Sequence, residues 1–219
     1  MTTNDASKAH GAPRGGDPLA PYRRAVADGA EGFDATLWAS PATQRLRFEV
    51  IAGMADLCGR RIVDAGCGPG DLASYLAESG CEHQEYTGVD GLETVIEQAQ
   101  AREIPRSRFI AGDFVADPGL LASLEGDVVV ISGTLNTMAD DQALAVLEAA
   151  WSAAGRALAF NFLSDRAVDP APRQLAPARR LPTMRLLDWA LSKTPHVRFR
   201  QDYFAGGHDA TIAMRRSED

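Results

Sequence analysis

The chain has 219 residues, 45% of them hydrophobic and 24% charged, with a formal net charge of −8. This composition is that of a globular protein long enough to bury a core, and the acidic balance disfavours non-specific nucleic-acid binding. No apolar run reaches the ~18–20 residues that a membrane span needs. The three cysteines, Cys58, Cys67 and Cys81, lack metal-ligand spacing. We therefore expect reduced thiols, no metal site and a cytoplasmic location.

The beginning of the chain predicts a tail followed by two helices. Residues 1–18 are polar and rich in Gly, Ala and Pro, without the apolar run of a signal peptide, and we expect them to be disordered. One domain is expected over 19–219. A short helix is predicted over 19–28. A stronger one begins after Ser40, a good N-cap followed by proline, and runs to about residue 57.

From residue 61 onward, short β-type runs alternate with helical segments, which predicts βαβ units with right-handed crossovers. The expected strands are 61–65, 86–90, 108–111, 128–132 and 157–163, and the expected helices are 71–79, 92–102, 120–124 and 140–154. A helix over 183–194 follows, and then two strands, 197–204 and 209–214, so close together that they must pair antiparallel. The predicted fold class is α/β, with helices on both faces of a mostly parallel sheet and a C-terminal antiparallel hairpin.

Three alternating glycines, Gly66, Gly68 and Gly70, follow the first expected strand and precede a helix. Glycines in such a loop allow a tight turn and let the backbone approach a ligand without a Cβ in the way. The helix after the loop presents free N–H groups. The loop therefore predicts a nucleotide-type cofactor site, and the alternative is a glycine-rich turn that binds nothing.

Three acids refine this prediction. Asp90, followed by Gly91, ends the second expected strand, where a carboxylate can accept from both hydroxyls of a ribose. Asp113 ends the third, where it can accept from an adenine amino group; either acid can instead be a helix cap or turn residue. Asp64 lies just before the loop, where it would repel a pyrophosphate but favour the ammonium and sulfonium of S-adenosylmethionine.

With these residues the sequence resembles the class I S-adenosylmethionine-dependent methyltransferases. Residues 63–70 are similar to their first motif, Asp90 to their second-strand acid, and Asp113 with Phe114 to their adenine-side motif. The resemblance covers residues 61–214 and implies a seven-stranded Rossmann-like sheet. The cofactor-binding residues that we expect from the loop, the acids and the resemblance are Asp64, Gly66, Cys67, Gly68, Gly70, Asp90, Gly91, Asp113, Phe114 and Ser132.

Arg47 lies in the middle of the apolar face of the helix after Ser40, where a cation needs a partner. One candidate is the carboxylate of the methionyl part of the cofactor, which an arginine can bind in bidentate fashion. The other is an acid inside the protein. Trp38 and Gln44 lie just upstream and, with Arg47, resemble a Trp…Gln…Arg-Phe signature of a small-protein branch of the family. Trp38 either covers the cofactor or belongs to the core.

Substrates of open α/β sheets meet the carboxyl ends of the strands. Asn136 and Asn161 lie there and either orient an acceptor or cap loops. His208 is a possible base, as are its neighbours Asp209 and Tyr203, although a lone histidine at a turn is more often a surface residue. The arginines of residues 169–182 either hold an anionic substrate or form a solvated loop.

The predicted reaction is in-line transfer of the sulfonium methyl group to a small-molecule acceptor, with the protein supplying orientation and electrostatics. One alternative is an enzyme that cyclises or cleaves S-adenosylmethionine. Another is a non-catalytic subunit that only binds the cofactor. A nicotinamide-dependent dehydrogenase is a more distant alternative.

Overall fold

The computed structural model describes residues 16–30, 32–36, 38–173 and 176–217. The predicted disordered tail, residues 1–18, lies almost wholly outside the described residues. Within them, seven strands form one sheet in the order β3-β2-β1-β4-β5-β7-β6. The strands are β1 (Arg61–Ala65), β2 (Glu85–Asp90), β3 (Ser107–Ala111), β4 (Val128–Ile131), β5 (Ala157–Leu163), β6 (Val197–Arg200) and β7 (Asp209–Arg215).

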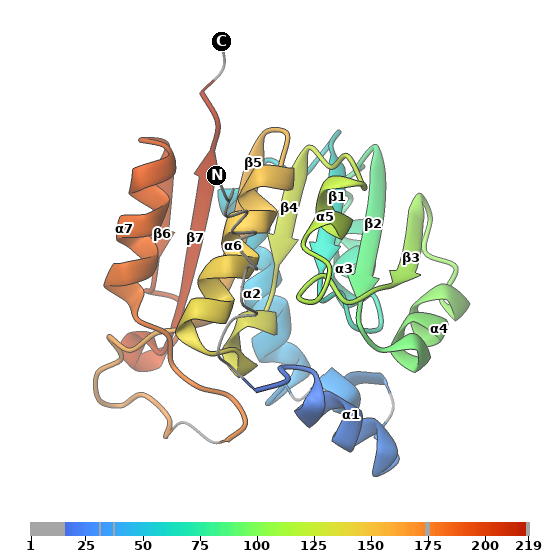
Figure 1. Ribbon diagram of the computed structural model, residues 1–219, viewed down its shortest axis with the longest axis horizontal. Coiled ribbons are helices and arrows are strands. Elements are labelled where there is room, and N and C mark those ends of the chain that lie inside the picture. Colours follow the sequence, from blue (N-terminus) through green and yellow to red (C-terminus); the bar gives the residue numbers. More distant parts are fainter. Residues whose placement is uncertain (1–15, 31, 37, 174–175, 218–219) are drawn as a thin grey trace, which may run out of the picture.

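Helices cover both faces of this sheet (Figure 1). One face packs against α5 (Gly119–Ala122), α6 (Asp140–Ala153) and α7 (Thr183–Lys193), and the other against α2 (Pro41–Met54), α3 (Asp71–Glu78) and α4 (Glu93–Ala101). Along β4, Val129 faces the first layer whereas Val128 and Val130 face the second, as a strand buried on both sides requires. The three-layer α/β prediction is confirmed.

The C-terminal hairpin is confirmed as well. The strands β1 to β5 pair in parallel, whereas β7 runs antiparallel between β5 and β6. The pair Leu163 and Asp209 aligns the end of β5 with the start of β7. The strand β6 ends at Arg200 rather than at residue 204, and the chain then passes through a 3-10 helix over Ala205–Gly207 before β7. This turn brings the hairpin loop to the carboxyl end of the parallel strands.

The predicted start of α2 is also confirmed. The hydroxyl of Ser40 accepts a hydrogen bond from the backbone N–H of Thr43 at 3.3 Å, and Pro41 occupies the first helical position. The helix ends at Met54, three residues before the predicted end, because Ala55 is already extended. Further upstream lie α1 (Ala20–Ala27) and a 3-10 helix over Gly32–Thr36.

The prediction of three reduced cysteines is wrong for two of them. Cys58, after α2, forms a disulfide with Cys81, after α3, and their Cα atoms are 5.2 Å apart. They are 23 residues apart in sequence, and only the packing of α2 and α3 on one face brings them together. Cys67 is the free, buried one. The cysteines therefore give no support to a reducing compartment.

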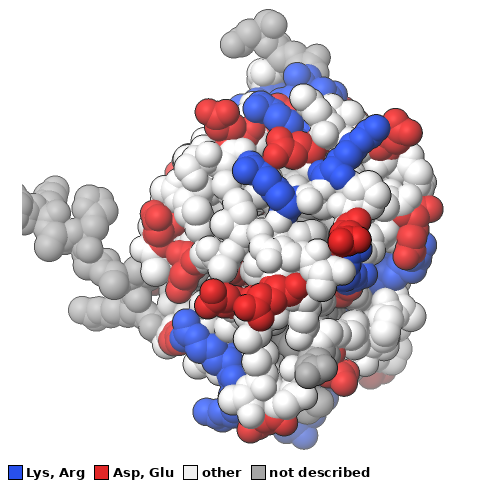
Figure 2. All heavy atoms as spheres, turned by 90° about the vertical axis from the view of Figure 1, so that its right-hand side faces the viewer, with Lys and Arg blue, Asp and Glu red and all other residues white. Residues whose placement is uncertain are grey.

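The outer surface carries charges of both signs. On the face shown in Figure 2, acidic and basic side chains are interspersed around uncharged areas rather than gathered by sign. Among the described residues, no helix is both long enough and apolar enough to cross a membrane.

Candidate cofactor and substrate site

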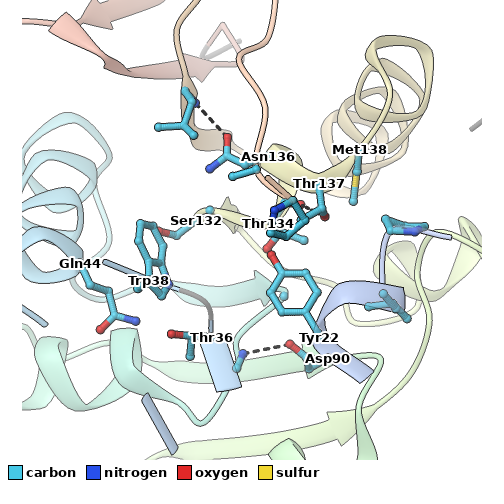
Figure 3. A pocket seen from close by; sticks show the side chains of 18 of the residues that line it. Tyr22, Thr36, Trp38, Gln44, Asp90, Ser132, Thr134, Asn136, Thr137 and Met138 are labelled. Atoms are coloured by element: carbon cyan, nitrogen blue, oxygen red, sulfur yellow. Dashed lines mark hydrogen bonds between the residues drawn. The ribbon is translucent and has the colours of Figure 1, made fainter. Parts of the chain in front are cut away.

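A cavity of about 470 Å³ lies at the carboxyl ends of the parallel strands. The loops after β1, β2, β3 and β4 line one part of it, and described residues of 172–173 and 176–180, together with the hairpin loop, line another. Described residues of the ranges 18–22, 36–39 without 37, and 44–48 supply the remaining wall (Figure 3). This is where open α/β sheets bind their ligands.

The glycine loop adopts a backbone path that other residues resist. Gly66, Gly68 and Gly70 have φ angles of +85°, +54° and +84°. A Cβ on Gly66 would lie 2.0 Å from the hydroxyl oxygen of Thr134, and one on Gly70 would lie 2.9 Å from the ring of Phe109. At Gly68 the nearest atom, Cγ2 of Thr36, would be 3.5 Å away, so a Cβ there would make only an ordinary van der Waals contact. Gly66 and Gly68 line the cavity, whereas Gly70 lies outside the lining and fixes the packing of the loop.

Asp64 is a buried acid with one uncommitted oxygen. It is 2% exposed, its Oδ2 accepts a hydrogen bond from the Tyr86 hydroxyl, and its Oδ1 has no partner among the described residues. Burial raises the pKa of Asp64 to about 7, the Tyr86 hydrogen bond opposes the rise, and the charge of Asp90 adds to it. An unpaired carboxylate oxygen in a cavity wall suits a cationic group.

Asp90 fixes the loop from the next strand. Its Oδ2 accepts from the N–H of Gly68 at 3.1 Å and its Oδ1 from the N–H of Leu92 at 3.0 Å. Burial raises the pKa of Asp90, and these backbone N–H groups oppose the rise. The next residue, Gly91, has no room for a side chain, because a Cβ on it would lie 2.5 Å from the side chain of Leu19. Asp90 and Gly91 both line the cavity.

Asp113 combines a turn role with a place in the cavity. Its Oδ1 accepts from the N–H groups of Val115 and Ala116, both at 3.0 Å, which is the turn role that the sequence left open. Asp113 and the buried Phe114 line the cavity beyond Asp90. Cys67 also lines it as a buried thiol whose pKa is raised by burial.

The upstream segment contributes side chains that the sequence did not predict. The ring of Tyr22, from α1, lies close to Asp90 and Thr137 (Figure 3). Burial raises the pKa of Tyr22 to about 12; the hydrogen bond to Thr137 opposes this and the Asp90 charge adds to it. Trp38 lies over Gly133, where a Cβ would be 2.4 Å from its ring. The pattern of α1 gave no signal, because no side chain of this short helix is fully buried and Tyr22 itself is half-buried.

Arg47 forms a buried ion pair with Asp209. Its Nε and Nη2 lie 2.6 Å and 2.5 Å from Oδ2 of Asp209, and its Nη1 donates to the carbonyl oxygen of Thr43 at 3.0 Å. The guanidinium is stacked between the rings of Trp38 and Phe204, at 4.5 Å and 4.6 Å from the ring centres. Of the two partners considered for Arg47, the structure shows the acid inside the protein. Binding of the cofactor carboxylate by Arg47 stays a prediction.

Asp209 is the acid of this ion pair, and Tyr203 is hydrogen-bonded to it. The Tyr203 hydroxyl donates to Oδ1 of Asp209 at 2.6 Å, and burial raises the pKa of Asp209 while Arg47 opposes the rise. Neither residue lines the cavity. Of the three possible bases at the hairpin, His208 alone lines it. The His208 ring packs on Phe204 at 4.8 Å between centres, with Nδ1 3.1 Å from the carbonyl oxygen of Ala205.

The two predicted asparagines differ in position, since Asn136 lines the cavity and Asn161 does not. Asn161 caps the neighbouring strand end: its Oδ1 accepts from the N–H of Gly133 at 2.7 Å, and its amide nitrogen donates to the hydroxyl of Ser132 at 3.3 Å. It does not line the cavity, so the structure shows the cap that the sequence had left open, and a role of Asn161 in orienting the acceptor stays a prediction. Asn136 and Ser132 do line it. Asn136 is 8% exposed and its Oδ1 accepts from the N–H of Leu163 at 2.9 Å.

Comparisons with known proteins agree with this fold and site. Residues 62–157 match the family model described as a methyltransferase domain. A ubiquinone biosynthesis O-methyltransferase of Neisseria meningitidis is 44% identical over 55 residues, which are 25% of this chain. This stretch spans only 22% of that relative.

Solved structures share the fold over most of the chain. Magnesium protoporphyrin IX methyltransferase from Synechocystis, solved with bound S-adenosylmethionine, aligns with a TM-score of 0.58 at 20% identity, over 90% of this chain and 89% of that one. The DhpI complex titled DhpI-SAM-HEP aligns with a TM-score of 0.61 at 18% identity, over 96% of this chain and 100% of that one.

The fold and the glycine loop define a Rossmann-like protein with a methyltransferase domain. Together with the acids at the ends of β2 and β3, these features make the chain similar to the class I S-adenosylmethionine-dependent methyltransferases, whose fold it shares.

Proposed function

We propose that this protein transfers the methyl group of S-adenosylmethionine to a small-molecule acceptor. The observation that carries the proposal is the buried Asp64, which lines the cavity beside Gly68 and has one oxygen, Oδ1, without a partner among the described residues. A buried carboxylate without a cation is costly, and the ammonium of the cofactor is a fitting partner. A cavity of about 470 Å³ is within the range of small-molecule sites.

The residues present fit the cofactor along its whole length. Asp90 keeps lone pairs for the ribose hydroxyls while its backbone hydrogen bonds hold it in place. The Oδ2 of Asp113 makes no hydrogen bond within the described chain, so it is available to an adenine amino group. Bound S-adenosylmethionine supplies an activated methyl group at its sulfonium.

The chain supplies orientation and exclusion of water. Tyr22 and Trp38 cover the cavity from the upstream segment, which keeps bulk water from the reacting atoms. Asn136 offers an amide that orients an acceptor, and His208 offers an imidazole that takes a proton from an acceptor oxygen or nitrogen. Alignment of nucleophile and methyl carbon accounts for ~7–11 kcal/mol of barrier lowering without further catalytic groups.

The test uses cofactor binding and product analysis together. Calorimetry measures binding of S-adenosylmethionine, and mass spectrometry follows its conversion in the presence of a metabolite extract. We expect S-adenosylhomocysteine to form only with the extract. Release of methylthioadenosine without any acceptor would instead show the cyclising or cleaving reaction, and binding without any product would show a non-catalytic subunit.

Asp90→Ala is the matching variant, and we expect it to weaken cofactor binding by at least tenfold, because hydrogen bonds to a charged group are worth about 1.5–3 kcal/mol. Asp188→Ala is its control, since Asp188 is exposed on α7 and lies outside the cavity lining. Unchanged binding in Asp90→Ala would contradict the proposed orientation of the cofactor.

A further inference from the structure

The charged side chains that line the cavity are separated by sign. Asp64, Asp90 and Asp113 lie along the strand ends assigned to the cofactor. At the other part of the cavity lie Arg173, Arg180 and His208, whereas Arg47, the remaining arginine of the lining, is paired with Asp209. Resting on the proposed function, we propose that the acceptor is an apolar molecule with an anionic oxygen group, a carboxylate or a phosphoryl group, held by Arg173, Arg180 and His208.

Arg180 is a fixed cation without a counter-ion. Its Nη1 donates to the carbonyl oxygens of Ser164 and His208, at 2.8 Å and 3.2 Å, and its Nη2 donates to that of Pro172 at 3.0 Å. These partners are neutral, and no carboxylate of the described residues forms an ion pair with Arg180. By contrast, Arg179 beside it is paired with Asp140 at 2.7 Å. In a protein with a net charge of −8, an unpaired half-buried guanidinium in a cavity wall indicates an anionic ligand.

The hydrogen bonds of Arg180 also fix its position. They join the segment after β5 to the hairpin loop, so the guanidinium is held before any ligand arrives. A cation fixed in advance loses little conformational entropy when it binds an anion. Arg173 is exposed at the same part of the cavity and has no ion-pair partner within the described chain, so it adds a second, adjustable cation.

A hydrogen-bond donor completes this group. Asn136 is 8% exposed and its Oδ1 is occupied by the N–H of Leu163, while its amide nitrogen makes no hydrogen bond within the described chain. In Figure 3 that nitrogen is directed to the side of the cavity where Trp38 lies. Two guanidinium groups and one amide N–H group are donors only. Ligand oxygens would satisfy them, whereas an amine would leave them unpaired.

The walls around these donors are apolar. They are formed by Trp38, Met138, Leu163, Pro172 and Pro177. An acceptor that fits both features has an apolar or aromatic body with the anionic group at one end. A nucleic acid would instead present a charged backbone along its whole length, which these walls do not match.

The experiment measures ligand binding to protein saturated with S-adenosylhomocysteine, so that the cofactor part of the cavity is filled. The probes are aromatic and aliphatic carboxylic acids, each paired with its primary amide, and phenyl phosphate paired with phenol. We expect at least one acid or phenyl phosphate to bind tenfold or more tighter than its neutral pair, and the stronger series identifies the group. If no anionic probe binds tighter than its neutral pair, the inference is overturned.

Variants assign the preference to the arginines. We expect Arg173→Gln to weaken binding of the anionic probe three- to tenfold and Arg180→Gln to remove the preference for it, with Arg180→Lys retaining part. Arg185→Gln is the control, since Arg185 forms a surface ion pair with Asp141 outside the cavity. A preference that survives in both glutamine variants would overturn the assignment. Circular dichroism checks that each variant is folded.

Failure of S-adenosylhomocysteine to bind would contradict the proposed function itself, whereas normal binding without anion preference contradicts only this inference.

Discussion

Replacing Asp64 with asparagine is expected to stabilise the cofactor-free protein and to weaken cofactor binding. Burial raises the pKa of Asp64 from 3.8 to about 7, a difference of about 3 units. Between pH 3.8 and pH 7, Asp64 is therefore protonated in the native state and ionised in the unfolded chain. The stability contributed by this proton is complete below pH ~4 and is lost as the pH rises through 7.

The magnitude follows from the shift. At 1.36 kcal/mol per unit, ionised Asp64 costs the cofactor-free protein at most about 4 kcal/mol at pH 8. Asparagine does not titrate and can still accept from the Tyr86 hydroxyl, so the stability of Asp64→Asn relative to wild type is expected to grow from pH 5 to pH 8. Its affinity for S-adenosylmethionine is expected to fall 30-fold or more, because a buried charge pair loses one partner, which costs about 2–5 kcal/mol.

Urea unfolding at pH 5, 6, 7 and 8 gives the free energy of unfolding, and calorimetry in buffers of different ionisation enthalpy gives the affinity and the protons released. Wild type is expected to release about half a proton on binding at pH 7, and the variant none from this site. Asp188→Asn is the exposed control. Parallel pH profiles for wild type and Asp64→Asn, or equal affinities for the cofactor, would refute the reasoning.

Three further predictions concern stability. Arg47→Met and Asp209→Asn are each expected to lower the free energy of unfolding by about 3–5 kcal/mol, and the double variant by less than their sum, since a buried ion pair is costly to break from one side; additive losses in urea unfolding would contradict this. Gly66→Ala is expected to destabilise by at least 1–2 kcal/mol from its φ of +85° alone and to abolish cofactor binding in calorimetry, and a variant that folds and binds normally would contradict the loop geometry. Reduction of the Cys58–Cys81 disulfide is expected to cost about 3 kcal/mol for its loop, seen as a lower Tm with reductant, with the Cys58→Ser variant insensitive to reductant.

The sequence was sufficient for the fold because local and global signals agree. The strands β1 and β5 begin and end where alternation and apolar runs predicted, and Ser40 caps α2 as expected. The glycine loop and Asp90 were predictable for a similar reason, since adjacent parallel strands bring their carboxyl ends to one edge. These features depend on short stretches of chain.

Features that depend on distant segments were not predictable. The pattern of α2 showed that Arg47 needed a partner, but nothing in it identified Asp209, 162 residues away. The place of Asn161 in β5 suggested a site residue. Within the described fold, however, its amide group forms hydrogen bonds with Ser132 and Gly133. Tyr22 gave no signal because its contacts are made only when α1 packs over the cavity.

The ion pair between Arg47 and Asp209 has a consequence for how the protein is made. At about 5–20 residues per second, Asp209 leaves the ribosome about 8 to 32 s after Arg47. Until then the nascent chain holds an arginine on an apolar helix face whose acid has not yet been translated. The glycine loop and the parallel strands can assemble during this interval, but the wall formed by Arg47 cannot. The part of the cavity wall that contains Arg47 therefore reaches its paired arrangement only after Asp209 has been synthesised.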